Sequence, residues 1–221
     1  MSGLPWKGND QETGADMGGY VSNWLGKIKA TRPFNTLPNL EGPGTPGPIG
    51  QEFAILNYIG RKVPAMAGES DADFCASQQI MYVAEDIYGK LDRFAAPTAF
   101  APKTDDHLVA ARKSFWAEPD ATQHNSTYGA HVYLAQLDDY YTKLGLGGAK
   151  FTTTGRTVGE CKLFSSLHAL VMCKSDILSK YAGLTAFYDR FKGEKETAAC
   201  LENGGNYPHN FAQYFQPPTD A

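Results

Sequence analysis

The sequence predicts a small α/β unit followed by an all-helical unit, and three observations indicate this fold class. A strand-like segment that contains a proline lies at residues 33–41, and a helical pattern comes after it at residues 51–62. From about residue 70 onward, apolar side chains recur mainly at helical spacing. We therefore place a partial α/β domain at residues 1–64 and an all-helical domain at residues 65–221.

The first unit begins with a polar, glycine-rich stretch in which residues 20–29 are a helix candidate. Pro38 interrupts the next segment, a strand, and a proline cannot donate a hydrogen bond to a strand ladder. It must therefore lie at a sheet edge, at a bulge or in a cis turn. The Gly- and Pro-rich residues 41–50 predict a hairpin or wide turn, and Val63-Pro64 ends the helix over residues 51–62.

The second unit contains six predicted helices. Thr157 followed by Glu160 is typical of a capping box, in which side chain and backbone satisfy each other at a helix start. Gly145-Leu146-Gly147-Gly148 breaks the helical pattern. We expect helices at about residues 70–94, 105–116, 128–144, 157–174, 176–192 and 194–202.

Composition excludes several classes of function. The net charge of −4 and the isoelectric point near 5.7 argue against a nucleic-acid or anionic-membrane partner. No apolar run approaches the roughly 20 residues that cross a bilayer. The four cysteines are widely spaced and form no metal-binding pattern, so we expect free thiols in a reducing intracellular compartment, the cytosol or an organelle interior.

Two motifs in this order resemble the cytosolic glutathione S-transferase family. The first runs from Pro33-Phe34 through Leu37-Pro38-Asn39-Leu40 to Gln51-Glu52-Phe53-Ala54-Ile55-Leu56-Asn57-Tyr58-Ile59. The second is Phe151 followed by Thr157-Val158-Gly159-Glu160-Cys161-Lys162-Leu163-Phe164. The resemblance covers roughly residues 20–205 and implies a thioredoxin-like unit joined to a glutathione-transferase-type helical domain.

The resemblance also indicates that the N-terminal unit is truncated. In the family, a first strand and helix precede the matched region and carry the catalytic Tyr, Ser or Cys, which favours the thiolate of glutathione. Here only residues 1–6 precede a segment similar to the one that comes after that first helix, so the catalytic residue is unknown. Loss of a central strand exposes sheet edges. We expect a smaller sheet, another chain that covers the gap, or a shortened product.

The resemblance implies a glutathione-type site in the first unit. Leu37, before a cis Pro38, offers its backbone to the cysteinyl part of glutathione, although a cis proline also shapes the fold without any ligand. Gln51 and the next residue hold the γ-glutamyl end at a helix N-terminus, which suits an anion. The family has Ser or Thr at that next position, whereas Glu52 places a carboxylate there and argues against tight binding.

Trp24 and Lys29 resemble the family's Trp and Lys that reach the glycine carboxylate, with a spacing one residue longer. The alternative is a core aromatic and a solvated charge. Asp86 occupies a place where many family members have an acidic ligand contact across a dimer, but Glu85 and Asp92 are equally consistent with solvated charges. His124 and His131 lack a nearby third ligand, so we expect no metal site.

The resemblance leaves three functions open. The chain is either a non-catalytic, glutathione-transferase-like accessory subunit of a larger protein assembly, an active transferase that conjugates glutathione to electrophiles, or a carrier of a small ligand or pigment. Glutathione is the one ligand that the resemblance implies. Other protein chains that cover the incomplete sheet are the expected partners, and a homodimer stays open because family members are commonly dimers.

Overall fold

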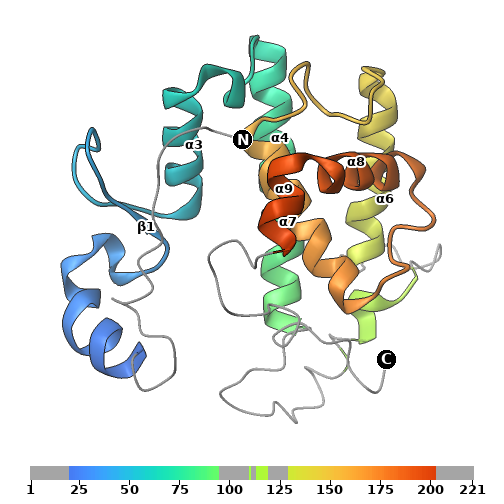
Figure 1. Cartoon of the computed structure of the whole chain (residues 1–221). Helices are drawn as coiled ribbons and strands as arrows, with labels where there is room; N and C mark the ends of the chain where they lie inside the picture. The colour runs from blue at the N-terminus through green and yellow to red at the C-terminus, as the bar shows by residue number, and fades with distance from the viewer. Residues whose placement is uncertain (1–19, 95–109, 111–112, 119–128, 203–221) are drawn as a thin grey trace. The chain divides into compact units, whose positions relative to one another are not determined.

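The computed structural model describes residues 20–94, 110, 113–118 and 129–202, and the chain divides into two compact units, residues 1–67 and 68–221 (Figure 1). The join lies a few residues beyond the Val63-Pro64 pair. Each unit has its own helices and turns.

Short turns dominate the described part of the first unit. Its two strands pair antiparallel, with Asn39 opposite Gly50 and Leu40 opposite Ile49. The elements are the π-helix η1 (Tyr20–Ile28), the 3₁₀ turns η2 (Lys29–Thr31) and η3 (Pro33–Asn35), strands β1 (Asn39–Leu40) and β2 (Ile49–Gly50), helix α3 (Glu52–Lys62) and the 3₁₀ turn η4 (Pro64–Met66).

The strand expected over residues 33–41 is wrong in its length. Only Asn39–Leu40 pair, because Phe34 and Asn35 have positive φ angles of 57° and 55° inside η3 and cannot continue a strand. Pro38 stands immediately before β1, and the Leu37–Pro38 peptide bond is cis, which is one of the three placements that the sequence allowed. The helix expected at residues 20–29 is present as η1, a π-helix.

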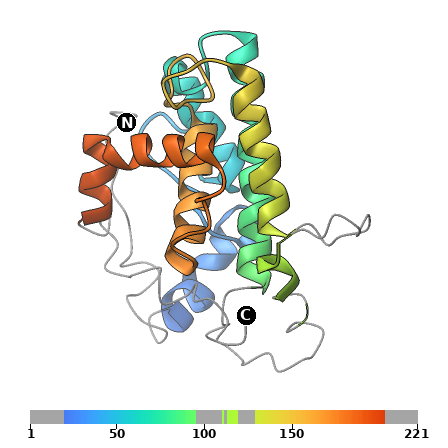
Figure 2. The same cartoon turned by 90° about the vertical axis from the view of Figure 1, so that its right-hand side faces the viewer.

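Helices make up most of the described second unit, and most of their predicted positions are correct. They are α4 (Asp71–Phe94), α6 (Ala130–Leu144), α7 (Val158–Cys173), α8 (Ala182–Gly193) and α9 (Lys195–Glu202). Residues 113–116 are also helical, and the rest of the segment predicted at 105–116 lies almost wholly outside the described residues. Figure 2 shows α6 beside α4, with α8 crossing α7 near one end.

The helix predicted to start at residue 176 begins only at Ala182. Residues 174–181 form successive turns instead, in which the Ile177 N–H donates to the Lys174 carbonyl at 3.1 Å. Ile177, Leu178 and Tyr181 are all buried, so these apolar residues enter the core from turns. The apolar spacing that predicted a helix therefore marks buried residues correctly here, but they belong to turns.

The core of the second unit forms chiefly where α4 packs on α7. Small residues allow the close approach, since the Ser166 hydroxyl donates to the Ala84 carbonyl at 2.9 Å. The largest side chains buried nearly completely include Phe115, Phe151, Phe187, Phe191, Ile80, Met81, Ile87, Leu91 and Leu134. Among the described helices, none combines the length and apolar character that a membrane crossing requires.

Candidate functional site

The antiparallel register brings the two halves of the predicted site to the same end of the β1–β2 hairpin. Asn39 lies opposite Gly50, so Pro38 and Gln51 are the next positions outward on the two strands. Turn η3 packs against β2, and a side chain on Gly50 would meet the Pro33 Cβ at 3.1 Å. The local fold thus places Leu37–Pro38 near the start of α3.

Leu37 presents both its side chain and its backbone. The side chain is 47% exposed, and neither the N–H nor the carbonyl of Leu37 hydrogen-bonds to another described residue. A backbone pair of this kind can hold an extended peptide by strand-like hydrogen bonds. The neighbouring Phe34 is 74% exposed, which is a large apolar surface for a unit with so short a sheet.

Gln51 occupies an unusual backbone position at the start of α3. Its φ of 71° and ψ of 124° lie outside the ordinary regions for a residue with a side chain, which costs on the order of 1–3 kcal/mol. The Gln51 carbonyl accepts the first helical bond from the Ile55 N–H at 3.1 Å, and its side chain makes no capping bond. Such outliers concentrate at ligand clamps and active sites.

Glu52 lies in the first turn of α3 and is half-buried. A carboxylate is favourable there because the free N–H groups of a helix start carry partial positive charge. The negative charge of Glu52 would, however, repel the carboxylate of an anionic ligand at this helix start. The position therefore matches the predicted one, and its chemistry opposes the predicted ligand.

Trp24 and Lys29 are placed on neighbouring turns of the first unit. Trp24 lies in η1, and its side chain falls outside what the structure describes. Lys29 opens η2, and its side chain makes no hydrogen bond or ion pair with any described residue. Turn η2 packs on η3, and the role of Lys29 in the site stays a prediction.

The candidate residues of the helical unit that the structure describes are either exposed or in contact with other residues of that unit. Asp86 is exposed on α4, whereas Glu85 forms an ion pair with the buried Lys162 at 2.7 Å. The Lys162 ammonium also lies 4.7 Å from the centre of the Tyr88 ring. The Asp92 side chain and His124 lie outside the described residues. No group of three possible metal ligands occurs in the part of the chain that the structure describes.

All four cysteines are free. Burial raises the pKa of Cys161 and Cys173 to about 12 each, with the Glu160 carboxylate adding to the effect at Cys161. A thiol needs a lowered pKa to act as a nucleophile at neutral pH. These two residues are therefore inert core thiols, while Cys75 and Cys200 are exposed.

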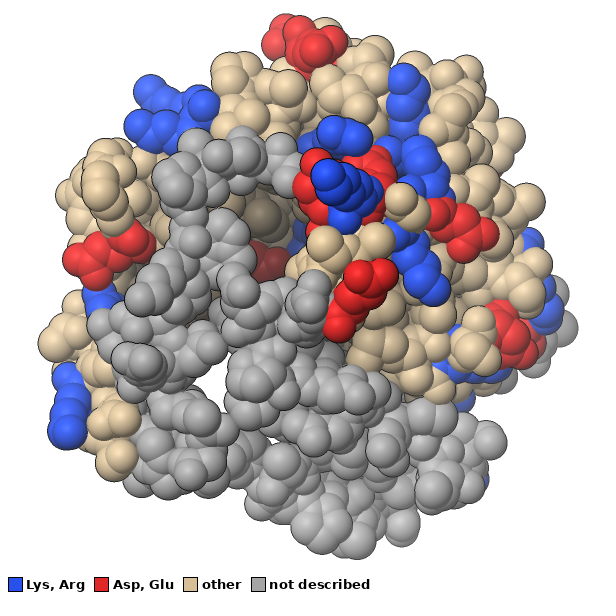
Figure 3. Space-filling view, viewed as in Figure 1, with Lys and Arg blue, Asp and Glu red and all other residues tan. Residues whose placement is uncertain are grey.

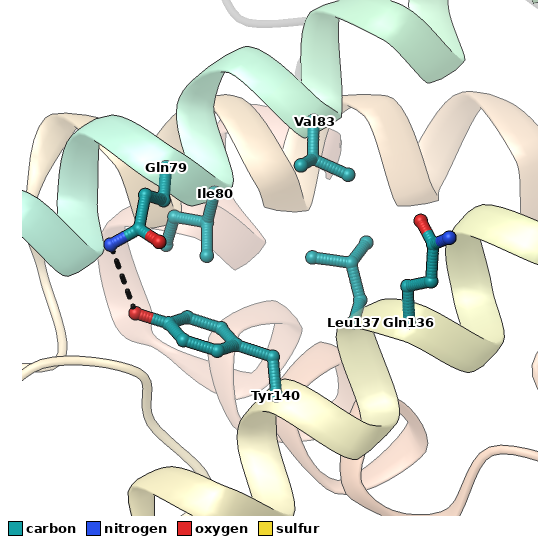
Figure 4. Close-up of a pocket in the computed structure, with 6 residues that line it drawn as sticks. All are labelled: Gln79, Ile80, Val83, Gln136, Leu137 and Tyr140. Carbon is teal, nitrogen blue, oxygen red and sulfur yellow. Dashed lines mark hydrogen bonds between the residues drawn. The ribbon is translucent and has the colours of Figure 1, made fainter.

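A small hollow lies between α4 and α6 (Figure 4). Its lining includes Ile80, Val83 and Leu137, and the Gln79 side-chain amide donates to the Tyr140 hydroxyl across it at 3.5 Å. Burial raises the pKa of Tyr140, with a smaller contribution from Cys75. The volume of about 90 Å³ is well below the roughly 300 Å³ at which ligand pockets begin, so the hollow does not suit a tripeptide.

Charged side chains of both signs are mixed on the face shown in Figure 3. Arg156 and Arg190 both contact the Glu194 carboxylate, at 3.1 Å and 2.6 Å. One carboxylate thus pairs with two cations in the helical unit.

Solved structures with the same fold identify the architecture. The chain superimposes on monomeric Na-GST-3, a glutathione S-transferase of the hookworm Necator americanus, with a TM-score of 0.63 and 16% identity over 86% of this chain and 82% of that one. The glutathione S-transferase of Ascaris lumbricoides gives 0.61 and 19% over 86% and 82%. Prostaglandin synthase D of Nilaparvata lugens gives 0.61 and 18% over 85% and 81%.

The chain therefore has the glutathione S-transferase fold, with a truncated thioredoxin-like unit followed by a helical domain. The resemblance drawn from the two sequence motifs is confirmed at the level of the fold. No protein-family model matches the sequence, and no curated protein matches it either.

Proposed function

We propose that this protein is a non-catalytic member of the glutathione-transferase fold that serves as an accessory subunit of a larger protein assembly. One observation carries the proposal. The described part of the first unit has a sheet of two strands with two residues each, packed on the single helix α3, and a hairpin this short has little stability of its own in water. Such a unit gains stability when a further surface covers it.

Exposed apolar side chains on the same unit support this interpretation. Phe34, Leu37 and Leu25 are 74%, 47% and 45% exposed. Apolar side chains exposed on so small a unit favour a contact surface. Glu52 adds a second argument, because its carboxylate occupies the helix start at which the resembling family would hold an anionic ligand.

The test compares Phe34→Ser/Leu37→Ser with a matched surface variant. Leu146→Ser is the control, because Leu146 is also exposed, at 40%, but belongs to the helical unit. We expect the wild-type chain and the Leu146 variant to elute from native extracts in a large complex, and the double variant to elute as a small species. A wild-type chain that elutes alone and monodisperse would refute the proposal.

Glutathione conjugation is a second candidate, favoured by the unpaired Leu37 backbone and the strained Gln51. The purified chain is applied to immobilised glutathione and assayed with glutathione and an aryl electrophile. Retention and turnover that Gln51→Ala abolishes, and that Gln79→Ala on α4 leaves intact, would establish this candidate and overturn the non-catalytic proposal. We expect no turnover above the uncatalysed rate.

A further inference from the structure

One segment of the first unit combines exposed apolar side chains with cations. Residues 25–37 run through η1, η2 and η3, and η2 packs on both of the others. Five side chains of this segment define what we call the apolar–cationic strip: Leu25, Lys27, Lys29, Phe34 and Leu37. All three apolar members are exposed. No Asp or Glu occurs in residues 20–40, so the strip has no carboxylate of its own.

The two lysines of the strip are not neutralised within the described part of the chain. Lys27 Nζ lies 3.5 Å from the amide oxygen of Asn23, a neutral group, and Lys29 makes no ion pair with a described residue. Arg32 differs, because the Glu41 carboxylate binds it at 2.5 Å.

The local charge also differs in sign from that of the whole chain. Residues 20–67 contain five Lys or Arg and two Glu, a net charge of +3, whereas the chain as a whole carries −4. Opposite charges across an interface favour association and suppress wrong partners. The described part of the first unit is therefore complementary to an acidic partner.

Phe34 has the features of an anchor residue within the strip. Its φ of 57° and the φ of 55° at Asn35 place two consecutive residues with side chains in the left-handed region, which is unfavourable for both. The Phe34 ring is nevertheless 74% exposed, so burial of the ring does not offset this strain in the free chain. Backbone strain concentrates at functional sites, and aromatic anchors dominate the energy of protein interfaces.

We propose that the apolar–cationic strip binds a segment of another protein in which carboxylates flank apolar side chains. The Phe34 ring packs against the apolar groups of that segment, and its carboxylates pair with Lys27 and Lys29. This inference rests on the accessory role proposed above and identifies the chemistry of the partner. An anionic membrane fits less well, because lipid-binding clusters have about four to eight Lys or Arg and the strip has two.

Photo-crosslinking from position 34 identifies what covers the strip. The full chain with Phe34→p-benzoylphenylalanine is added to a native extract and irradiated, and mass spectrometry identifies the crosslinked segments. Phe74→p-benzoylphenylalanine is the control, because Phe74 is also exposed, at 46%, but lies in α4. We expect position 34, and not position 74, to label a segment of another protein with Asp or Glu beside its apolar residues.

Charge reversal tests the contribution of the two lysines. In the crosslinking chain, Lys27→Glu/Lys29→Glu should lower the yield of this product about fivefold or more, because attraction becomes repulsion. Raising the salt concentration from about 50 to about 500 mM should lower the yield without any substitution, since salt screens exposed charges.

Arg61→Glu/Lys62→Glu is the matched control for charge reversal. It changes the charge of the same unit by the same amount, but Arg61 and Lys62 end α3, about 15 Å along the helix axis from its start beside β2. We expect this variant to keep the yield within about twofold of that of the parent crosslinking chain. Equal losses in the two charge variants would overturn the proposed contact, because only the net charge of the unit would then matter.

The outcomes separate the acidic partner from the accessory role itself. A labelled segment without carboxylates, a segment of this chain or of a second copy, or a product with lipid would overturn the acidic partner. So would the absence of labelling from position 34 in a chain that still elutes in a large complex, and in all these cases the accessory role is unaffected. A wild-type chain that elutes alone from native extracts would refute both.

Discussion

The backbone N–H of Gly159 donates to the hydroxyl of Ser77 at 3.1 Å, which ties the first turn of α7 to α4 across 82 residues of sequence. The contact is possible only because residue 159 has no side chain. An added Cβ would lie 2.0 Å from the Ser77 carbonyl oxygen and 2.7 Å from its carbonyl carbon. These are backbone atoms, so they cannot move aside as the end of a flexible side chain would.

Gly159→Ala should therefore destabilise the helical unit strongly. The two helices must separate to admit one methyl group, and overpacking of this kind costs about 1–3 kcal/mol or more. Gly89→Ala is the matched control, because Gly89 lies in α4 with nothing within 4 Å of an added Cβ. That change should be neutral or stabilising by about 0.5–1 kcal/mol through helix propensity. Urea unfolding monitored by circular dichroism measures both.

Glu160 supports a second prediction about the same helix. Its buried carboxylate accepts five hydrogen bonds from Phe151, Thr152 and Thr157, including the Phe151 N–H at 2.8 Å and the Thr152 hydroxyl at 2.7 Å. Glu160→Gln would turn an amide NH₂ group toward these donors. We expect a loss of about 3 kcal/mol in the free energy of unfolding.

Glu202→Gln provides the comparison for that measurement, since Glu202 is exposed at the end of α9. It should leave the unfolding midpoint unchanged. If Glu160→Gln also left the unfolding midpoint unchanged, the hydrogen bonds at the start of α7 would contribute nothing to folding.

Local signals made part of this fold predictable from the sequence. Thr157 and Glu160 are three residues apart, and their reciprocal capping bonds arise from that spacing alone. The turn at Gly145, with a φ of 61°, and the helix start at Gln51 were equally local. Each prediction required only neighbours in sequence.

Contacts between distant residues could not be predicted in this way. Thr153 meets Asp73 across 80 residues and His131 meets Tyr181 across 50, and no pattern in the sequence marks either pair. The strand at residues 33–41 failed for a different reason. The segment predicted a buried strand, but Phe34, a residue type that rarely adopts a positive φ, has one here.

A third prediction concerns the effect of Glu52 on glutathione binding at the predicted site. Glu52→Ser restores the residue type that the resembling family has in the first turn of this helix. Removing the carboxylate should relieve repulsion of an anionic ligand at the helix start, and we expect glutathione affinity to rise about tenfold, equivalent to ~1.4 kcal/mol. Isothermal titration calorimetry measures the change.

Glu41→Ser is the control for calorimetry, because Glu41 belongs to the same unit but pairs with Arg32 at 2.5 Å instead of lying at the helix start. It should not tighten binding. If Glu52→Ser left the affinity unchanged, Glu52 would not be the reason for weak binding, and the second argument for a non-catalytic role would fall.

Asp73 supports a prediction about acid stability. It is buried, at 5% exposure, and accepts hydrogen bonds from the Thr153 backbone N–H at 2.8 Å and from the Thr153 hydroxyl. Burial alone would raise the pKa of Asp73, but the hydrogen bonds from Thr153 and Glu69 and the charge of Lys150 together lower it below 3.8. The folded carboxylate therefore holds its proton less readily than the unfolded one.

The stabilisation from Asp73 is fully present above pH 3.8 and is lost as the pH falls through the lower pKa of the folded state. Urea unfolding at pH 5.0 and pH 2.5 should show a smaller acid-induced loss in Asp73→Asn than in the wild type. Asp71→Asn, exposed in the same turn of α4, separates the Thr153 contacts from the general effect of removing a carboxylate. Equal losses in both variants would show that the Asp73–Thr153 pair does not couple folding to protons.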